Sequence, residues 1–138
     1  MLYLDKEAIR LIHQALSVWS EDDGEPIPAF DRAKQEEIDA LVAIQSQGFF
    51  GIEAYPTLLE KAAIIFYTIN KKQIFLNGNK RMSTLALLVF LGINGKRLDV
   101  SSDELTRKAL WLANTASIDF PKIKVELLDW LHKHVLDM

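Results

Sequence analysis

The sequence predicts an all-α protein in which several helices surround one hydrophobic helix. Apolar residues recur at helical spacing along most of the chain, and no pair of segments shows the alternation typical of paired strands. Residues 79–94 are apolar almost all round, as expected for a helix at the centre of a bundle. A length of 138 residues favours one domain over residues 1–138.

The first half of the chain predicts two helices separated by loops. Asp5 is placed to cap a helix over residues 5–20, whose apolar positions repeat at helical spacing. Residues 21–29 contain a glycine, two prolines and several acidic residues, which is typical of a loop. Helical spacing resumes over residues 31–47. Residues 48–56 are rich in aromatic side chains between a glycine and a proline, and we expect another loop there.

Two adjacent segments predict the buried centre of the protein. Residues 57–72 have apolar side chains at most positions and predict a largely buried helix. Residues 79–94 predict the central helix, and Gly95 suits its C-terminal cap. A tight loop therefore joins these two helices.

The C-terminal part predicts two more helices. Ser101 or Ser102 is expected to begin the first, which continues through Leu112. Pro121 fits the first turn of the last helix, because that position needs no backbone N–H donor, and the helix is expected to end near Val135.

Composition excludes several classes of protein. The chain has no cysteine, which rules out disulfides and thiolate metal sites, and the spacing of His13, His132 and His134 is not that of a metal site. No secretory signal is present, and the longest apolar run, residues 85–91, is too short to span a membrane. We therefore expect a cytoplasmic protein without membrane contact. A net charge of −3 disfavours nucleic-acid binding.

The predicted loop between the two buried helices carries the chemistry of most interest. Residues 70–81 read NKKQIFLNGNKR, with cations on both sides of a Gly-Asn pair at the start of the central helix. A helix N-terminus presents unpaired N–H groups and the positive end of its dipole to an anion. Gly78 allows close approach of a ligand to the backbone, and the Arg81 guanidinium matches phosphate oxygens. Six of the sixteen basic residues fall at Lys71, Lys72, Lys80, Arg81, Lys96 and Arg97, and in a chain that is negative overall this clustering indicates a local anion site.

Two interpretations of these cations remain open. They form a phosphate-binding site, or they are solvated charges at the start of an ordinary helix. Cations are unfavourable at a helix N-terminus unless an anion is bound there, and this supports the interpretation as a phosphate-binding site.

Residues 73–81, QIFLNGNKR, resemble the signature loop of the Fic/Doc (Fido) family, H-x-F-x-[D/E]-[G/A]-N-[K/G]-R. Lys80, together with Thr84 in place of a second arginine, resembles the death-on-curing (Doc) branch of toxins. The buried helix before the loop and the hydrophobic helix after it extend the likeness. The resemblance implies a Fido-type helical bundle and a toxin of a toxin-antitoxin system.

The resemblance also implies roles for three loop positions. Gln73 stands where the family has a catalytic histidine that acts as the general base, and glutamine cannot accept a proton near neutral pH. Asn77 stands at the position of the acid that holds Mg²⁺, so the charged metal ligand is missing. Phe75 is the implied structural anchor of the loop, which differs little from an ordinary core phenylalanine.

The remaining loop positions are implied to bind phosphate. Gly78 and Asn79 would form an anion-binding nest, Lys80 would add a positive charge, and Arg81 would hold a phosphate as part of the catalytic site. The cofactors implied by the family are ATP and Mg²⁺. Residues 48–55 fall where the family has a flap that aligns the target segment, although ordinary packing also explains the aromatic residues there.

Two function classes follow from these residues. In the first, the protein transfers a phosphoryl or adenylyl group from ATP to a hydroxyl of a target protein such as a translation factor, with activity impaired by Gln73 and Asn77. In the second, it is a catalytically silent Fido domain that binds a nucleotide or a protein. An antitoxin protein is an expected partner in the first class. A small helical DNA-binding protein is disfavoured by the acidic net charge.

Overall fold

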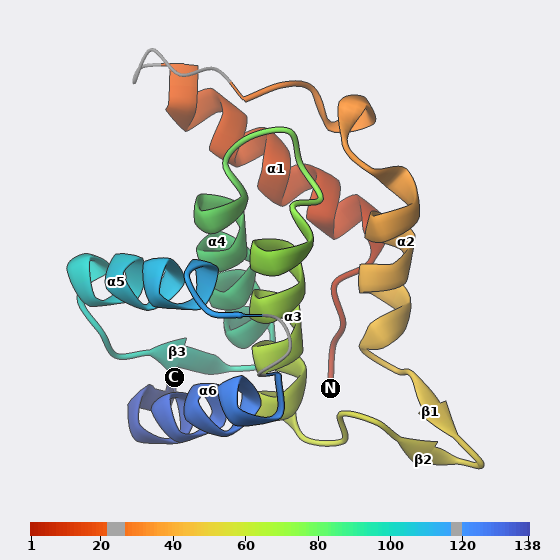
Figure 1. Cartoon of the computed structure of the whole chain (residues 1–138), viewed down its shortest axis with the longest axis vertical. Helices are drawn as coiled ribbons and strands as arrows, with labels where there is room; N and C mark the ends of the chain where they lie inside the picture. Colours follow the sequence, from red (N-terminus) through yellow and green to blue (C-terminus); the bar gives the residue numbers. More distant parts are fainter. Residues whose placement is uncertain (22–26, 117–119) are drawn as a thin grey trace.

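The prediction of an all-α fold is confirmed. The structure is a computed structural model that describes residues 1–21, 27–116 and 120–138, so residues 22–26 of the predicted loop 21–29 lie outside it. Figure 1 shows helices packed around a central pair, with short strands at the margins. The helices described are α1 (Lys6–Glu21), α2 (Gln35–Ile44), α3 (Leu58–Lys72), α4 (Asn79–Ile93), α5 (Ser102–Ala113) and α6 (Phe120–His134).

Helices α3 and α4 lie side by side in the middle of the molecule, and α1 crosses the end at which the loop joins them (Figure 1). Helix α4 was predicted to be central, and its core residues include Met82, Leu87 and Phe90, each with no exposed surface. Helix α3 is buried more completely than α4, since all but one of the residues from Lys61 to Asn70 are buried. Apolar burial on this scale is the main stabilising term for a fold of this size.

The predicted caps at Asp5 and Ser101 are present, and Thr57 forms a third. The side-chain oxygen of Asp5 accepts a hydrogen bond from the backbone N–H of Ala8 at 2.8 Å and so caps α1. Thr57 caps α3 and Ser101 caps α5 in the same way, each at 3.1 Å from the residue three positions on. These bonds satisfy N–H groups that have no partner within the helix.

The expectation that the chain has no strand pairs was wrong. Strand β1 (Gly48–Phe49) pairs antiparallel with β2 (Ile52–Glu53), and β3 (Lys96–Leu98) pairs with β4 (Val135–Asp137). Segments of two or three residues are too short to show alternation in a sequence. The predicted aromatic loop is therefore a small hairpin.

The predicted helix 31–47 is shorter than expected. A 3₁₀ turn, Phe30–Arg32, comes first, and α2 begins only at Gln35. The backbone N–H of Lys34 donates to the carbonyl oxygen of Ile74 at 2.9 Å, and Lys34 itself has an extended conformation. This contact with the α3–α4 loop interrupts the helix at a point that the spacing of apolar residues does not reveal.

The turn after α4 holds both ends of the described chain. The side chain of Asn94 accepts from the backbone N–H of Leu2 at 2.7 Å and donates to the carbonyl oxygen of Leu2 at 2.9 Å. The neighbouring Gly95 accepts through its carbonyl from the N–H of Met138 at 3.0 Å. Residues 2 and 138 thus lie beside the same turn.

Candidate functional site

The α3–α4 loop is a closed turn held by its own polar groups. Gln73 ends α3 in the left-handed conformation with φ +50°, which reverses the chain. The side chain of Asn79 then accepts from the N–H of Phe75 at 3.0 Å and donates to the carbonyl of Phe75 at 2.8 Å. The Asn79 side chain therefore closes the loop, and its backbone N–H is the main-chain donor of this residue at the start of α4.

Phe75 anchors the loop in an aromatic cluster. Its ring is buried and stacks on the imidazole of His13 in α1, with 4.8 Å between ring centroids. The ring of Phe30 lies 5.6 Å from His13 and 6.3 Å from Phe75. Burial lowers the pKa of His13 because the imidazolium form loses solvation there. The loop is thus fixed against the helix that crosses its end.

The first turn of α4 differs from those of α1, α3 and α5. Those three helices begin with a capping side chain and carry an acidic residue in the first turn. Helix α4 has Gly78 as its N-cap, no acidic residue in its first turn, and the cations Lys80 and Arg81. Cations at this end of a helix oppose its dipole, and an anion bound there would reverse the sign of the interaction.

Gly78 is required by the backbone and by its surroundings. It has φ +79°, a region that residues with a Cβ rarely adopt. A Cβ at this position would lie 2.9 Å from Cδ1 of Ile27 and 3.9 Å from Nη2 of Arg81. The glycine therefore makes room for the Ile27 side chain at the start of α4.

The two positions that depart from the family pattern, Gln73 and Asn77, supply neither a proton acceptor nor a negative charge. Gln73 is exposed and has no group that takes a proton near neutral pH. Asn77 is exposed as well, and its Oδ1 accepts from the N–H of Gly78 at 2.8 Å. Among the described residues there is no group of three or more His, Asp or Glu that could hold a metal ion. The loop as it stands does not fit Mg²⁺, which in nucleotide sites is held by a carboxylate together with phosphates.

Two hollows flank the start of α4. A larger one of about 520 Å³ lies along α1 and is lined in part by His13, Ile27 and Phe30. A smaller one of about 140 Å³ lies between α4 and α5 and is lined in part by Lys80, Arg81 and Thr84. Both cations of the first turn thus border a hollow, with Lys80 exposed and Arg81 half-buried.

The predicted cluster of six cations does not form. Lys71 donates to the carbonyl oxygens of Leu112 and Thr115 at the end of α5. Lys96 pairs with Asp137, and Arg97 lies 3.6 Å from Asp99 at the far end of α4. The cations before and at the start of α4 are far from Lys96 and Arg97, because the helix between them is about 22 Å long. The cations left beside the loop are Lys72, Lys80 and Arg81.

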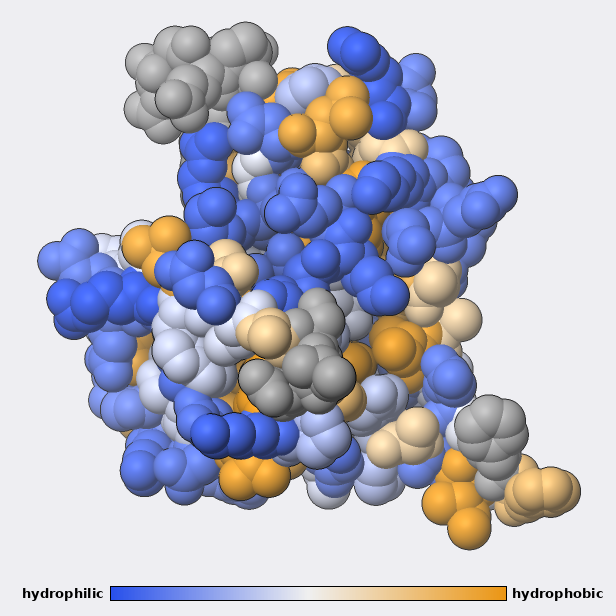
Figure 2. Space-filling model, viewed as in Figure 1, coloured by the Kyte–Doolittle hydropathy of each residue, from blue (hydrophilic) through white to orange (hydrophobic). Residues whose placement is uncertain are grey.

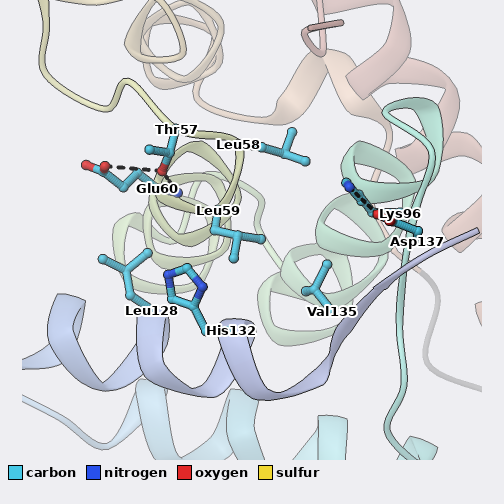
Figure 3. A pocket seen from close by; sticks show the side chains of 9 residues that line it. All are labelled: Thr57, Leu58, Leu59, Glu60, Lys96, Leu128, His132, Val135 and Asp137. Atoms are coloured by element: carbon cyan, nitrogen blue, oxygen red, sulfur yellow. Dashed lines mark hydrogen bonds and ion pairs between the residues drawn. The ribbon is translucent and has the colours of Figure 1, made fainter.

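Figure 3 shows where the Lys96–Asp137 pair lies instead. It borders a hollow of about 400 Å³ between the first turn of α3, the end of α6 and the two C-terminal strands. His132 points into this hollow among leucine and valine side chains (Figure 3). The hollow lies at the opposite end of α3 from the loop and takes no part in the candidate site.

The hairpin at residues 48–53 also lies away from the loop. It connects the end of α2 to the start of α3, whereas the loop follows the end of α3 (Figure 1). Phe50 at its tip is fully exposed, which excludes ordinary packing for that side chain, and Tyr55 is half-buried with the Lys124 ammonium 5.3 Å from its ring. The structure does not bring the predicted flap segment to the candidate site.

Two residues near the site were missed from the sequence. His13 was assessed only as a metal ligand, although its spacing from Ile9 and Leu16 places it on the apolar face of the first helix. Asn70 is buried and donates to the carbonyl of Ala109 at 3.2 Å, so it ties the end of α3 to α5. A lone polar residue in an apolar helix segment was the available signal.

Comparison with known proteins shows which family and which relative this sequence matches. Residues 3–91 match the model of the Fic/DOC family. A protein named Toxin Doc from Mycolicibacterium smegmatis is 36% identical over 66 residues, which make up 48% of this chain and 51% of that protein. The matched region thus covers about half the length of each protein. No helix in the described ranges is both long and apolar enough to cross a membrane.

Stability should fall as the pH drops through about 6.5, because of His13. Its pKa is lowered in the folded protein, so the unfolded chain binds the proton more readily. The contribution is fully present above the unfolded pKa of about 6.5 and is lost below it. Urea unfolding between pH 5 and 8 should show a shallower pH dependence for His13→Phe than for the native protein. Equal slopes for the two proteins would contradict this origin.

Alanine at Gly78 should destabilise the fold more than alanine at Gly95. Both glycines have positive φ, which costs an L-residue about 1–2 kcal/mol. A Cβ at Gly78 also meets Ile27 at 2.9 Å, whereas a Cβ at Gly95 meets nothing within 4 Å. Gly95→Ala is therefore the matched control for backbone strain in a denaturation experiment. A Gly78→Ala protein as stable as Gly95→Ala would show that Ile27 adapts without cost.

Proposed function

Because the chain belongs to the Fic/DOC family, we propose that its α3–α4 loop binds the phosphates of a nucleotide, with ATP as the expected ligand. We further propose that the protein is of the Doc toxin type and derives from enzymes that transfer a phosphoryl or adenylyl group to a protein hydroxyl. The Toxin Doc relative supports the toxin assignment. A translation factor is the proposed class of target.

The observation that carries the proposal is the start of α4. Its first turn combines a glycine cap in the left-handed conformation with two cations and no acid. Such a turn gains stability from a bound phosphate, since the N–H groups, the helix dipole and both side chains all favour an anion. A helix start that faces only solvent gains no stability from this combination, and the first turns of α1, α3 and α5 lack it.

The transfer step is proposed to be impaired. The attacking hydroxyl of a target must lose its proton, and the exposed amide of Gln73 cannot accept it. Loss of a general base typically slows a reaction by about 10²–10⁴. Asn77 brings no negative charge for Mg²⁺, and its oxygen is already used by the N–H of Gly78. The loop supplies binding and orientation, and the proton acceptor is lacking.

The larger hollow supports an antitoxin as a proposed partner. It runs along α1 and shares His13 and Phe30 with the aromatic cluster that anchors Phe75. Its lining combines apolar side chains, such as Ile27 and Phe30, with the charges of Arg10 and Asp31. An antitoxin segment that folds on binding would cover this hollow and the start of α4 together.

A second candidate function is a silent binding module. Gln73 and Asn77 together favour it, because both changes remove catalytic groups and leave the phosphate-binding turn intact. In that case nucleotide binding or partner binding is itself the function. The two candidates differ in whether restored catalytic groups produce transfer.

Arg81→Ala should weaken ATP binding by about 1.5–3 kcal/mol, or roughly 10- to 150-fold in Kd, because a charge-assisted hydrogen bond to phosphate is lost. Isothermal titration calorimetry of ATP and of inorganic phosphate would measure this. Arg97→Ala is the matched control, since that arginine lies at the far end of α4 beside Asp99. No measurable affinity in the native protein, or equal affinity in Arg81→Ala, would overturn the phosphate site.

Gln73→His should be tolerated by the fold and should restore a proton acceptor beside the loop. If the base alone is missing, this change yields ATP-dependent labelling of a protein in cell extract, raised about 10²–10⁴-fold over the native chain. If the metal ligand matters as much, labelling requires Gln73→His combined with Asn77→Asp. Radiolabelled ATP with the label at the α or γ position distinguishes adenylyl from phosphoryl transfer.

The same experiment decides between the two candidate functions. The control is the pair of changes combined with Arg81→Ala, which should abolish any labelling that depends on the phosphate site. A folded double variant that binds ATP and still transfers nothing would reject the transferase and leave the binding module.

A further inference from the structure

Lys61 is a buried cation at the start of α3. Only 1% of its surface is exposed, and a buried charge is tolerated only when it is paired and hydrogen-bonded. Its ammonium donates to the carbonyl oxygen of Gln45 and lies 3.2 Å from Oε1 of Glu53. The ring of Tyr3 lies 5.2 Å from the same nitrogen, within range of a cation–π contact.

The two polar partners of Lys61 lie on the two sides of the hairpin, one in the chain that leads into β1 and one in β2. Gln45 ends α2 shortly before β1, and Glu53 lies in β2. The Gln45 carbonyl is at the negative end of the α2 dipole, which strengthens its bond to a cation. Gln45 is itself fixed, since its side chain accepts from the N–H of Leu4 at 2.7 Å and donates to the carbonyl of Leu4 at 2.8 Å.

The hairpin tip is apolar and exposed. Phe50 has no packing contacts that reduce its exposure, and Ile52 beside it is exposed as well. Figure 2 shows this apolar tip projecting from one corner of the molecule. Phe50 has φ +53°, a conformation that costs an aromatic residue energy and persists only where the surroundings impose it. Gly48 allows the close pairing, because a Cβ there would lie 2.2 Å from the carbonyl oxygen of Ile52.

We propose that Lys61 clamps both sides of the hairpin, so that the hairpin is a fixed arm and not a lid that closes over the α3–α4 loop. One ammonium holds the chain before β1 and the side chain of β2, and the N–H of Ala54 donates to the carbonyl of Gln47 at 2.8 Å across the base. A pivot of the hairpin would break these contacts and leave the buried charge unpaired.

The position of the arm fits the same conclusion. Helix α3 separates it from the loop by about 22 Å, the length of fifteen helical residues. A lid would have to swing over that distance, whereas a clamped arm presents Phe50 and Ile52 at the other end of the molecule. This role is independent of whether the loop binds a nucleotide.

Amide hydrogen exchange measured by NMR tests the clamp on the full chain. Lys61→Met keeps the length of the side chain and removes the charge. The Ala54 amide at the hairpin base should exchange about 100-fold faster in this variant, while the Phe90 amide in the core of α4 keeps its native rate. Lys6→Met is the matched control, because Lys6 forms an exposed ion pair with Asp39 at 3.2 Å. It should leave both amides unchanged.

A second variant keeps the test decisive if Lys61→Met does not fold. Glu53→Ala removes the contact with one side and should speed exchange at Ala54 about tenfold, again without change at Phe90. Gly48→Ala breaks the strand pair directly, so the exchange rate of the Ala54 amide in that variant is the reference for an opened hairpin. Native exchange at Ala54 in the folded variants would overturn the clamp. Equal acceleration at Ala54 and Phe90 would also overturn it, since Lys61 would then support only the stability of the whole fold.

Discussion

The packing of α3 against α4 determines where each feature of this protein lies. Helix α3 is buried along most of its length and α4 along the face that meets it, so neither can rotate or slide without exposing apolar side chains. Their shared end carries the loop with Gln73 and Gly78, and the other end of α3 carries Lys61 and the hairpin. The fold thus separates an anion-attracting end from an apolar, projecting end. Each end has its own polar contacts, and neither depends on the other for its geometry.

In this loop, the groups suited to phosphate binding are different from the group needed for proton transfer. Phosphate binding depends on backbone N–H groups, a glycine and cations, which the first turn of α4 supplies. Proton transfer depends on one side chain with a suitable pKa, and the amide at position 73 has none. Asn77 turns its oxygen inward to the Gly78 N–H, so even its remaining metal-ligand atom serves the turn. A family loop altered at these two positions keeps its shape because Phe75 and Asn79, which hold that shape, are unchanged.

Much of the fold was predictable because its signals are local. The caps formed by Asp5, Thr57 and Ser101 depend on neighbours three residues away, and helical spacing marks the buried faces. The errors came from long-range contacts. The bond from Lys34 to Ile74 shortens α2, and Lys71 turns to the end of α5 instead of joining a cationic cluster.

The place of the loop between two helices was predicted correctly, because the loop residues are consecutive in sequence and both helices have local signals. The burial of His13 and Lys61 was not predicted, since a charged or titratable residue is usually exposed and only its partners reveal the exception. Those partners come from other segments, such as Glu53 for Lys61 and Phe75 for His13.

The turn at Asn94 and Gly95, which holds Leu2 and Met138, has a consequence for synthesis on the ribosome. The nascent chain can form α1, α3 and α4 early, but β3 has no partner until α5, α6 and β4 have been synthesised, so the β3–β4 pair forms later than the central helices.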